Sequence, residues 1–243
     1  MPASEEQKLQ IEDAAVRAGA VPPDSPDDAD DGAAGAPGPG TGRAERTGGA
    51  GGPGKGAFRA LGERERFAGG FLRLVTGTFV GPDGFIFDRD IVRHPGAVVI
   101  AAVEEDGRHV LCIRQFRAAV NDVLLELPAG KLDVAEEPIA DCAARELAEE
   151  VGVEAATLTQ LCSYYNSPGF ADERSTLFLA EGLTPCERSA QGVEEHNIEI
   201  ERVDLRTLDE MIATGRIVNG NTILGLLMAR EELRRRRRGV RAG

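Results

Sequence analysis

Turn sequences separate apolar-rich segments in the middle of the chain, and this pattern predicts paired strands. The segments 71–80 and 85–93 flank Gly-Pro-Asp-Gly, which is typical of a turn, so they predict a β-hairpin with ordered structure beginning near Phe67. The same arrangement recurs over 97–116, where Glu-Glu-Asp-Gly is the expected turn. A shorter strand that ends in a loop is expected at 123–130. The patterned region therefore begins with β-structure.

A helix is predicted next, because apolar residues recur every four positions from Ile139 to Val151 and form one stripe. Pro138 suits its first turn, where a missing N–H costs nothing, and Gly152 suits its C-terminal end. This order of elements predicts an α+β architecture, with a mixed sheet and helices packed on it. Further strands are expected at 157–165, 174–183 and 197–205, and further helices at 208–215 and 221–238.

The amino-acid composition of the two ends of the chain differs from that of the middle. The first 57 residues are rich in Gly, Pro, Ala and Asp and have almost no large apolar residue, so burial cannot offset the entropy of ordering them. We expect a disordered tail at 1–57, a β-hairpin region at 58–95, a main domain at 96–233 and a basic tail at 234–243. The arginine run at 234–238 favours a solvated helix end over a localisation or anion-binding patch.

The net charge of the chain bears on which kinds of partner it can bind. The formal net charge is −13, which argues against a general nucleic-acid or membrane surface. No apolar run approaches the ~20 residues needed to span a bilayer, and the polar N-terminus does not resemble a secretory signal. The four cysteines lack the paired spacing of a zinc site. We therefore expect a reduced, cytoplasmic protein without nucleic-acid or membrane partners.

Three carboxylates on the predicted helix are the candidate chemistry. Glu146 and Glu150 are four residues apart and face each other, which costs a helix a few tenths of a kcal/mol, and Glu149 lies beside them. A shared cation would turn this repulsion into attraction. Oxygen ligands of this kind suit Mg2+, which keeps several waters when it binds a protein.

These carboxylates belong to a longer pattern that resembles the Nudix box, G-x5-E-x7-R-E-U-x-E-E-x-G-U. The match is complete from Glu137 onward, with one departure: six residues, not five, separate Gly130 from Glu137. The extra residue falls in the loop before the helix, where insertions are tolerated best. The resemblance extends from about residue 67 to 233 and implies a Nudix fold, in which helices sandwich a mixed sheet. The residues that carry it are Gly130, Glu137, Arg145, Glu146, Glu149, Glu150 and Gly152.

Three further stretches, LELPAGKLD, IRQFR and YYNSPGFADE, resemble the ADP-ribose pyrophosphatases within that family. Pro168 also lies sixteen positions after Gly152, similar to the proline placement of this subfamily. The resemblance implies hydrolysis of ADP-ribose to AMP and ribose 5-phosphate with Mg2+, with Mn2+ as the alternative ion. It also implies metal ligands, namely the backbone carbonyl of Ala129 and the side chains of Glu146, Glu149 and Glu150, with Glu149 holding either a metal or a metal-bound water.

The resemblance implies roles for other residues too. Arg145 would orient the carboxylates, since its guanidinium matches them bidentately. Arg117 would contact the diphosphate of a small-molecule nucleotide substrate. Arg89 would approach the adenosine end from the other subunit of a homodimer whose N-terminal strands exchange. Pro168 and Gly169 would lie in the substrate-binding loop, although the same residues also favour an ordinary turn.

A general base is expected in a loop downstream of the helix, where the family often supplies it. The loop ERSAQGVEEHN offers Glu194, then Glu195 and then His196, in our order of preference. Two alternatives to the main hypothesis stay open. One is hydrolysis of another nucleoside diphosphate sugar or a dinucleotide. The other is a non-catalytic regulator that binds ADP-ribose, which predicts lost carboxylates or an attached DNA-binding module.

Overall fold

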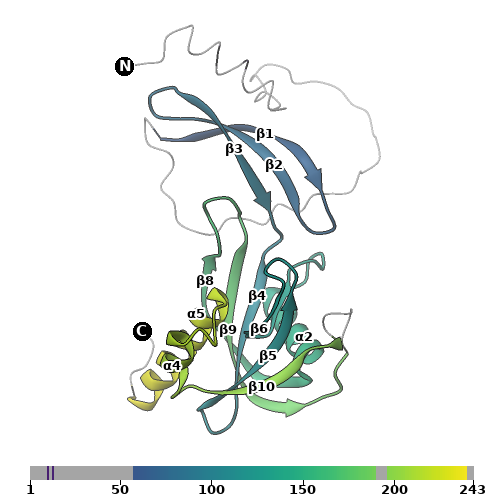
Figure 1. The fold of residues 1–243 in the computed structure, drawn as a ribbon, viewed down its shortest axis with the longest axis vertical. Coiled ribbons are helices and arrows are strands. Elements are labelled where there is room, and N and C mark those ends of the chain that lie inside the picture. Colours follow the sequence, from purple (N-terminus) through teal and green to yellow (C-terminus); the bar gives the residue numbers. More distant parts are fainter. Residues whose placement is uncertain (1–9, 11–12, 14–56, 190–195, 240–243) are drawn as a thin grey trace, which may run out of the picture. The chain divides into compact units, whose positions relative to one another are not determined.

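The structure is a computed structural model, and it describes residues 10, 13, 57–189 and 196–239 (Figure 1). These residues form two compact units. The first contains the described residues up to Phe67 together with Leu74–Ile91, and the second contains Ala68–Arg73 and the described residues from Val92 onward. The tail expected at 1–57 lies almost wholly outside the described residues.

The first unit is a three-stranded sheet in the order β1-β2-β3, formed by β1 (Arg59–Ala68), β2 (Arg73–Val80) and β3 (Ile86–Arg93). The predicted hairpin is β2 and β3, and the Gly81 N–H donates to the Phe85 carbonyl across its turn at 2.9 Å. Strand β1 was not predicted, so order begins earlier than Phe67. Its charged sequence hides it from an apolar-pattern search. Side-chain hydrogen bonds run from Arg66 to Thr76 at 2.8 Å and from Thr76 to Asp90 at 2.7 Å, linking the three strands.

The second unit contains a seven-stranded sheet in the order β10-β5-β4-β9-β8, with β6 paired to β5 and β7 paired to β4. Strands β4 and β9 pair in parallel, whereas the other pairs are antiparallel, so the predicted mixed sheet is confirmed. The strands are β4 (Ala97–Val103), β5 (His109–Arg117), β6 (Asp122–Glu126), β7 (Ala129–Lys131), β8 (Val153–Tyr165), β9 (Arg174–Pro185) and β10 (Glu199–Asp204).

Helices cover both faces of this sheet, as expected (Figure 1). Strand β4 is buried at every position, and its side chains alternate between two cores. Val98, Ile100 and Ala102 pack on the side of helix α2 (Ile139–Val151). The intervening residues, Val99, Ala101 and Val103, pack on the side of α4 (Leu208–Ala213) and α5 (Gly220–Arg237).

Helix α5 continues through Arg237, close to the end of the helix predicted at 221–238, so most of the arginine run is helical. Several of these arginines are paired. Arg235 and Arg236 contact Glu232, Arg236 also contacts Glu181 at 2.6 Å, and Arg237 donates to the Gly107 carbonyl. Among the described residues, no helix is both long enough and apolar enough to cross a membrane.

Candidate active site

Helix α2 presents one apolar side and one acidic side, and both are buried. Its N-cap is Pro138, one residue before the helix, and Gly152 ends it with a left-handed φ of 73°. Leu147 is fully buried against the sheet. The three carboxylates are also withdrawn from solvent, because Glu146, Glu149 and Glu150 are only 8, 9 and 3% exposed. Buried carboxylates require hydrogen-bonding or charged partners.

Arg145 supplies most of that compensation. Its Nε and Nη2 donate to the two carboxylate oxygens of Glu137 at 2.9 and 3.0 Å, forming a bidentate pair. Its Nη1 donates to Glu146 at 2.8 Å and to Glu149 at 3.3 Å. Hydrogen bonding to Glu137 raises the pKa of Arg145, and the same contact holds the pKa of Glu137 below its usual range. Arg145 therefore fixes the acidic side of the helix.

Strand β7 is pressed against this acidic side. The Ala129 N–H donates to Glu150 Oε2 at 2.9 Å. At Gly130, an added Cβ would lie 1.8 Å from Cδ of Glu146. Glycine leaves this space to the Glu146 carboxylate, which a side chain at position 130 would displace.

The loop between β7 and α2 absorbs the extra residue of the Nudix-like pattern. Glu136 has a positive φ of 62°, which is uncommon for a residue with a Cβ. The turn is closed by the Glu137 N–H, which donates to the Val134 carbonyl at 3.3 Å. Glu137 still reaches Arg145, so the extra residue leaves this pairing intact.

A cavity of about 700 Å³ opens above these groups. It contains six of the sequence-predicted site residues, which come from strands β5 and β7 and helix α2. Carboxylates and cations both line it, as a site for metal and an anionic substrate requires. The lining residues are Phe71, His94, Ala97, Val99, Gln115, Arg117, Ala129, Gly130, Lys131, Asp133, Val134, Arg145, Glu146, Glu149, Glu150, Glu173 and Asn221.

Arg117 lies in the cavity but is already engaged. Its Nε and Nη2 donate to the two carboxylate oxygens of Glu126 at 3.0 and 2.7 Å. Glu126 is 2% exposed, so this pair matches a buried carboxylate with a cavity arginine. Our sequence analysis missed Glu126. Strand pairing alone does not signal this contact, because the β5–β6 register pairs Arg117 with Asp122 and Glu126 with Ile113. The long side chains of Arg117 and Glu126 meet only in the folded structure.

Sequence reasoning also missed one wall of the cavity. Lys131 places its ammonium 4.5 Å from the ring centroid of Phe71, and His94 meets the same ring edge-on at 5.5 Å. We call Phe71, His94 and Lys131 the aromatic wall. No sequence motif connects them, because they come from three separate segments that only the fold assembles.

The remaining predicted residues either have other described environments or fall outside the described part of the chain. Pro168 and Gly169 are absent from the lining of the cavity. Arg89 lies on β3 in the first unit, where it donates to the Asp88 carbonyl and stacks over Phe87 at 4.6 Å. Glu194 and Glu195 fall outside the described residues, and His196 is exposed.

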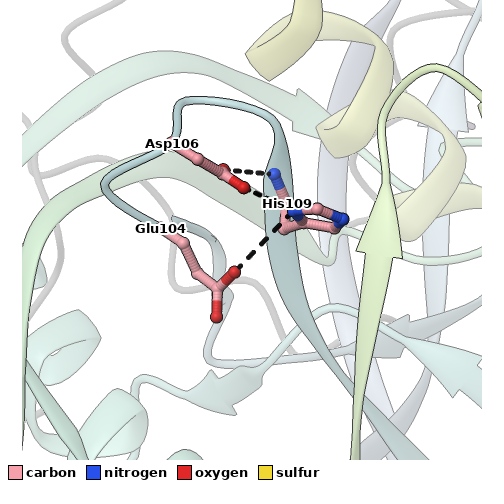
Figure 2. Close-up of side chains that lie close together, drawn as sticks. All are labelled: Glu104, Asp106 and His109. Atoms are coloured by element: carbon pink, nitrogen blue, oxygen red, sulfur yellow. Dashed lines mark hydrogen bonds and ion pairs between the residues drawn. The ribbon is translucent and has the colours of Figure 1, made fainter.

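A second group of potential metal ligands lies at the β4–β5 turn (Figure 2). Glu104, Asp106 and His109 have ligand atoms within 4.8 Å of one another. Each is already occupied: Arg202 binds both oxygens of Glu104, and Asp106 accepts from the N–H groups of Arg108 and His109 and contacts His109 Nδ1. The backbone hydrogen bond from His109 is the main reason why the pKa of Asp106 is lowered. This cluster therefore closes a turn at the far end of β4 and β5 from the cavity.

Comparison with known proteins agrees with this geometry. The family model for the NUDIX domain matches residues 92–223. The ADP-ribose pyrophosphatase of Bacillus subtilis (strain 168) is 35% identical over 164 residues, covering 68% of this chain and 88% of the relative. The methanol dehydrogenase activator of Bacillus methanolicus is 34% identical over 160 residues, covering 66% and 85%. The crystal structure of an ADP compounds hydrolase matches with a TM-score of 0.64 at 19% identity over 76% of this chain and 97% of that one, which shows the shared fold.

Proposed function

We propose that this chain, which belongs to the NUDIX domain family, hydrolyses the diphosphate bond of ADP-ribose to give AMP and ribose 5-phosphate. The observation that carries the proposal is the buried carboxylate group in the cavity, ordered by Arg145. The relation to the ADP-ribose pyrophosphatase of B. subtilis supports the choice of substrate. A protein kept only for its fold would not bury three carboxylates beside an open cavity.

The donor set fits a hard divalent cation. Glu146, Glu149 and Glu150 supply carboxylate oxygens in one cavity, and we assign them as ligands of Mg2+, or of Mn2+, together with the carbonyl of Ala129. When bound, such an ion neutralises phosphate charge and activates water. The chain itself orients the ligands: Arg145 holds Glu146 and Glu149, and the Ala129 N–H holds one oxygen of Glu150.

We keep Glu194, then Glu195, then His196 as candidates for the general base. A loop residue suits this role because the carboxylates of the helix are assigned as ligands. Substituting Gln for each glutamate separately tests it. One variant should lose kcat by roughly a hundredfold while binding substrate normally. Wild-type kcat in both single variants and in the double variant would place the base elsewhere.

A homodimer built by the N-terminal sheet is part of the proposal. That sheet exposes large apolar side chains, with Phe58 and Phe85 each 68% exposed and Phe67 63% exposed, which a second copy could cover. Light scattering tests the assembly, and a fully active monomer at micromolar concentration would contradict the homodimer.

Mixing the Arg89→Ala variant with the Glu146→Gln variant tests whether the two subunits share their sites. If Arg89 serves the partner's cavity, an equal mixture should regain about a quarter of wild-type activity, because half of the dimers would be mixed and each would hold one intact site.

A substrate panel decides between this function and its alternatives. ADP-ribose, other nucleoside diphosphate sugars and dinucleotides are supplied in turn with Mg2+, Mn2+ or EDTA, and a phosphatase coupled to phosphate detection reports product. Preferred turnover of ADP-ribose with metal is expected. Turnover of another substrate alone would select the alternative hydrolase. Binding of ADP-ribose without turnover would favour a regulator. The similarity to the methanol dehydrogenase activator supports this alternative. We also retain a cytoplasmic location as a proposal.

A further inference from the structure

The cations that line the cavity differ in how far their charge is already matched. Arg145 is hydrogen-bonded to Glu137 and Glu146, and Arg117 is paired bidentately with Glu126. Lys131 has no such partner: within the described part of the chain, no carboxylate oxygen lies within 4.0 Å of its ammonium. Lys131 therefore offers the cavity a charge that other groups have not already compensated.

The position of Lys131 follows from its strand. Lys131 pairs with Ala97 in the β4–β7 ladder, which fixes its backbone. Successive residues of a strand face opposite sides. Gly130 faces Glu146, so the Lys131 side chain projects from the other side of β7. Its ammonium rests on the Phe71 ring at 4.5 Å. A ring at a solvent-accessible site attracts a cation only weakly, so an anionic ligand can recruit the ammonium.

His94 adds a second donor to the aromatic wall. The Gly96 N–H donates to His94 Nδ1 at 3.0 Å, so Nδ1 is an acceptor and a neutral ring carries its proton on Nε2. Gly96 reaches this position with a φ of 104°, which favours glycine. The His94 N–H is held by Asp172 at 2.9 Å. The ring is thus fixed with Nε2–H as the group left for a ligand.

We propose that the aromatic wall is the phosphate-contacting side of the cavity, with Lys131 as the main cation that binds a phosphoryl oxygen of the nucleoside diphosphate sugar and His94 as a neutral donor beside it. The inference rests on the proposed function. It assigns to Lys131 the diphosphate contact that the family resemblance implied for Arg117, because the charge of Arg117 is already matched by Glu126. Five carboxylates line the cavity and repel an entering diphosphate, so an uncompensated ammonium contributes favourably to its binding. These carboxylates belong to Asp133, Glu146, Glu149, Glu150 and Glu173.

The test compares Lys131→Met, which keeps the apolar stem, with Lys131→Arg, which keeps the charge. The control is Arg202→Met, which removes one positive charge on β10, where Arg202 contacts Glu104 at the distant β4–β5 turn. With ADP-ribose and Mg2+, Lys131→Met should raise KM about tenfold, equivalent to about 1.4 kcal/mol, with kcat changed by less than about threefold, because a contact made equally in ground and transition states acts on KM. Lys131→Arg should recover most of this loss, and Arg202→Met should behave as wild type.

Three outcomes would overturn the inference, provided that all variants melt at the wild-type temperature. The first is a KM for Lys131→Met within twofold of wild type, and the second is an equal rise of KM in Arg202→Met. The third is a KM for Lys131→Arg as high as that of Lys131→Met. Calorimetric titration of ADP with Mg2+ separates the inference from the proposed function. If wild type binds ADP but does not hydrolyse ADP-ribose, the proposed function fails, and a weaker Kd in Lys131→Met still supports the wall. Equal Kd values, or no binding of ADP to wild type, would refute it.

Discussion

Replacing Gly130 with alanine should abolish most activity while leaving the fold nearly unchanged. The new Cβ would lie 1.8 Å from Cδ, 2.1 Å from Oε1 and 2.2 Å from Cγ of Glu146. Ordinary contacts between carbon atoms are about 3.5 Å, so the carboxylate must move by about 1.5 Å or more. A misplacement of about 1 Å can cost a hundredfold in rate. The stability cost should be small, because a flexible side chain gives way and Gly130 has no positive φ.

The assay measures kcat and KM for ADP-ribose in Mg2+, together with the melting temperature. Gly130→Ala should lower kcat by about a hundredfold. Gly70→Ala is the matched control, because its Cβ meets nothing within 4 Å. Glu146→Ala removes Cγ, Cδ and Oε1, all the overlapping atoms, so Gly130→Ala should add little further loss in that background. A kcat for Gly130→Ala within twofold of wild type, or a fully additive loss in the double variant, would refute the steric reasoning.

Three further predictions concern the carboxylates. Glu146→Gln and Glu150→Gln should each keep the fold, with metal-free stability unchanged or raised, yet lose about 3–4 kcal/mol of transition-state stabilisation; wild-type kcat in Mg2+ would contradict this. Glu126→Gln should lower the free energy of unfolding by about 1–3 kcal/mol, as measured by urea denaturation. This loss is smaller than for a fully buried ion pair because the Arg117 side chain is 41% exposed. An unchanged midpoint would contradict the prediction. Arg145 lowers the pKa of Glu137, so ionised Glu137 stabilises the fold above its unfolded pKa, and this contribution is lost as the pH falls through the folded pKa. Glu137→Gln should therefore flatten the decline in stability below about pH 4.5, and equal slopes in both proteins would exclude the coupling.

The sequence predicted the elements whose signals are local. The four-residue apolar repeat located α2, and turn residues located the β2–β3 hairpin, because spacing within one segment fixes which side chains share a face. Strand β1 was missed because Arg66, Thr76 and Asp90 join it to its neighbours by polar contacts between distant segments. The loop departure at Glu136 was visible in the sequence, but only the left-handed backbone shows how Glu137 still meets Arg145.

The sequence by itself determined the acidic helix face, since Glu146, Glu149 and Glu150 are adjacent on a helix whatever surrounds them. Only the tertiary structure decided what those charges meet. The close approach of Gly130, the pairing of Arg117 with Glu126 and the placing of Lys131 on Phe71 all join side chains from different elements. Contacts of this kind depend on strand register and on how the helix packs against the sheet. Residue spacing along the chain encodes neither of these directly.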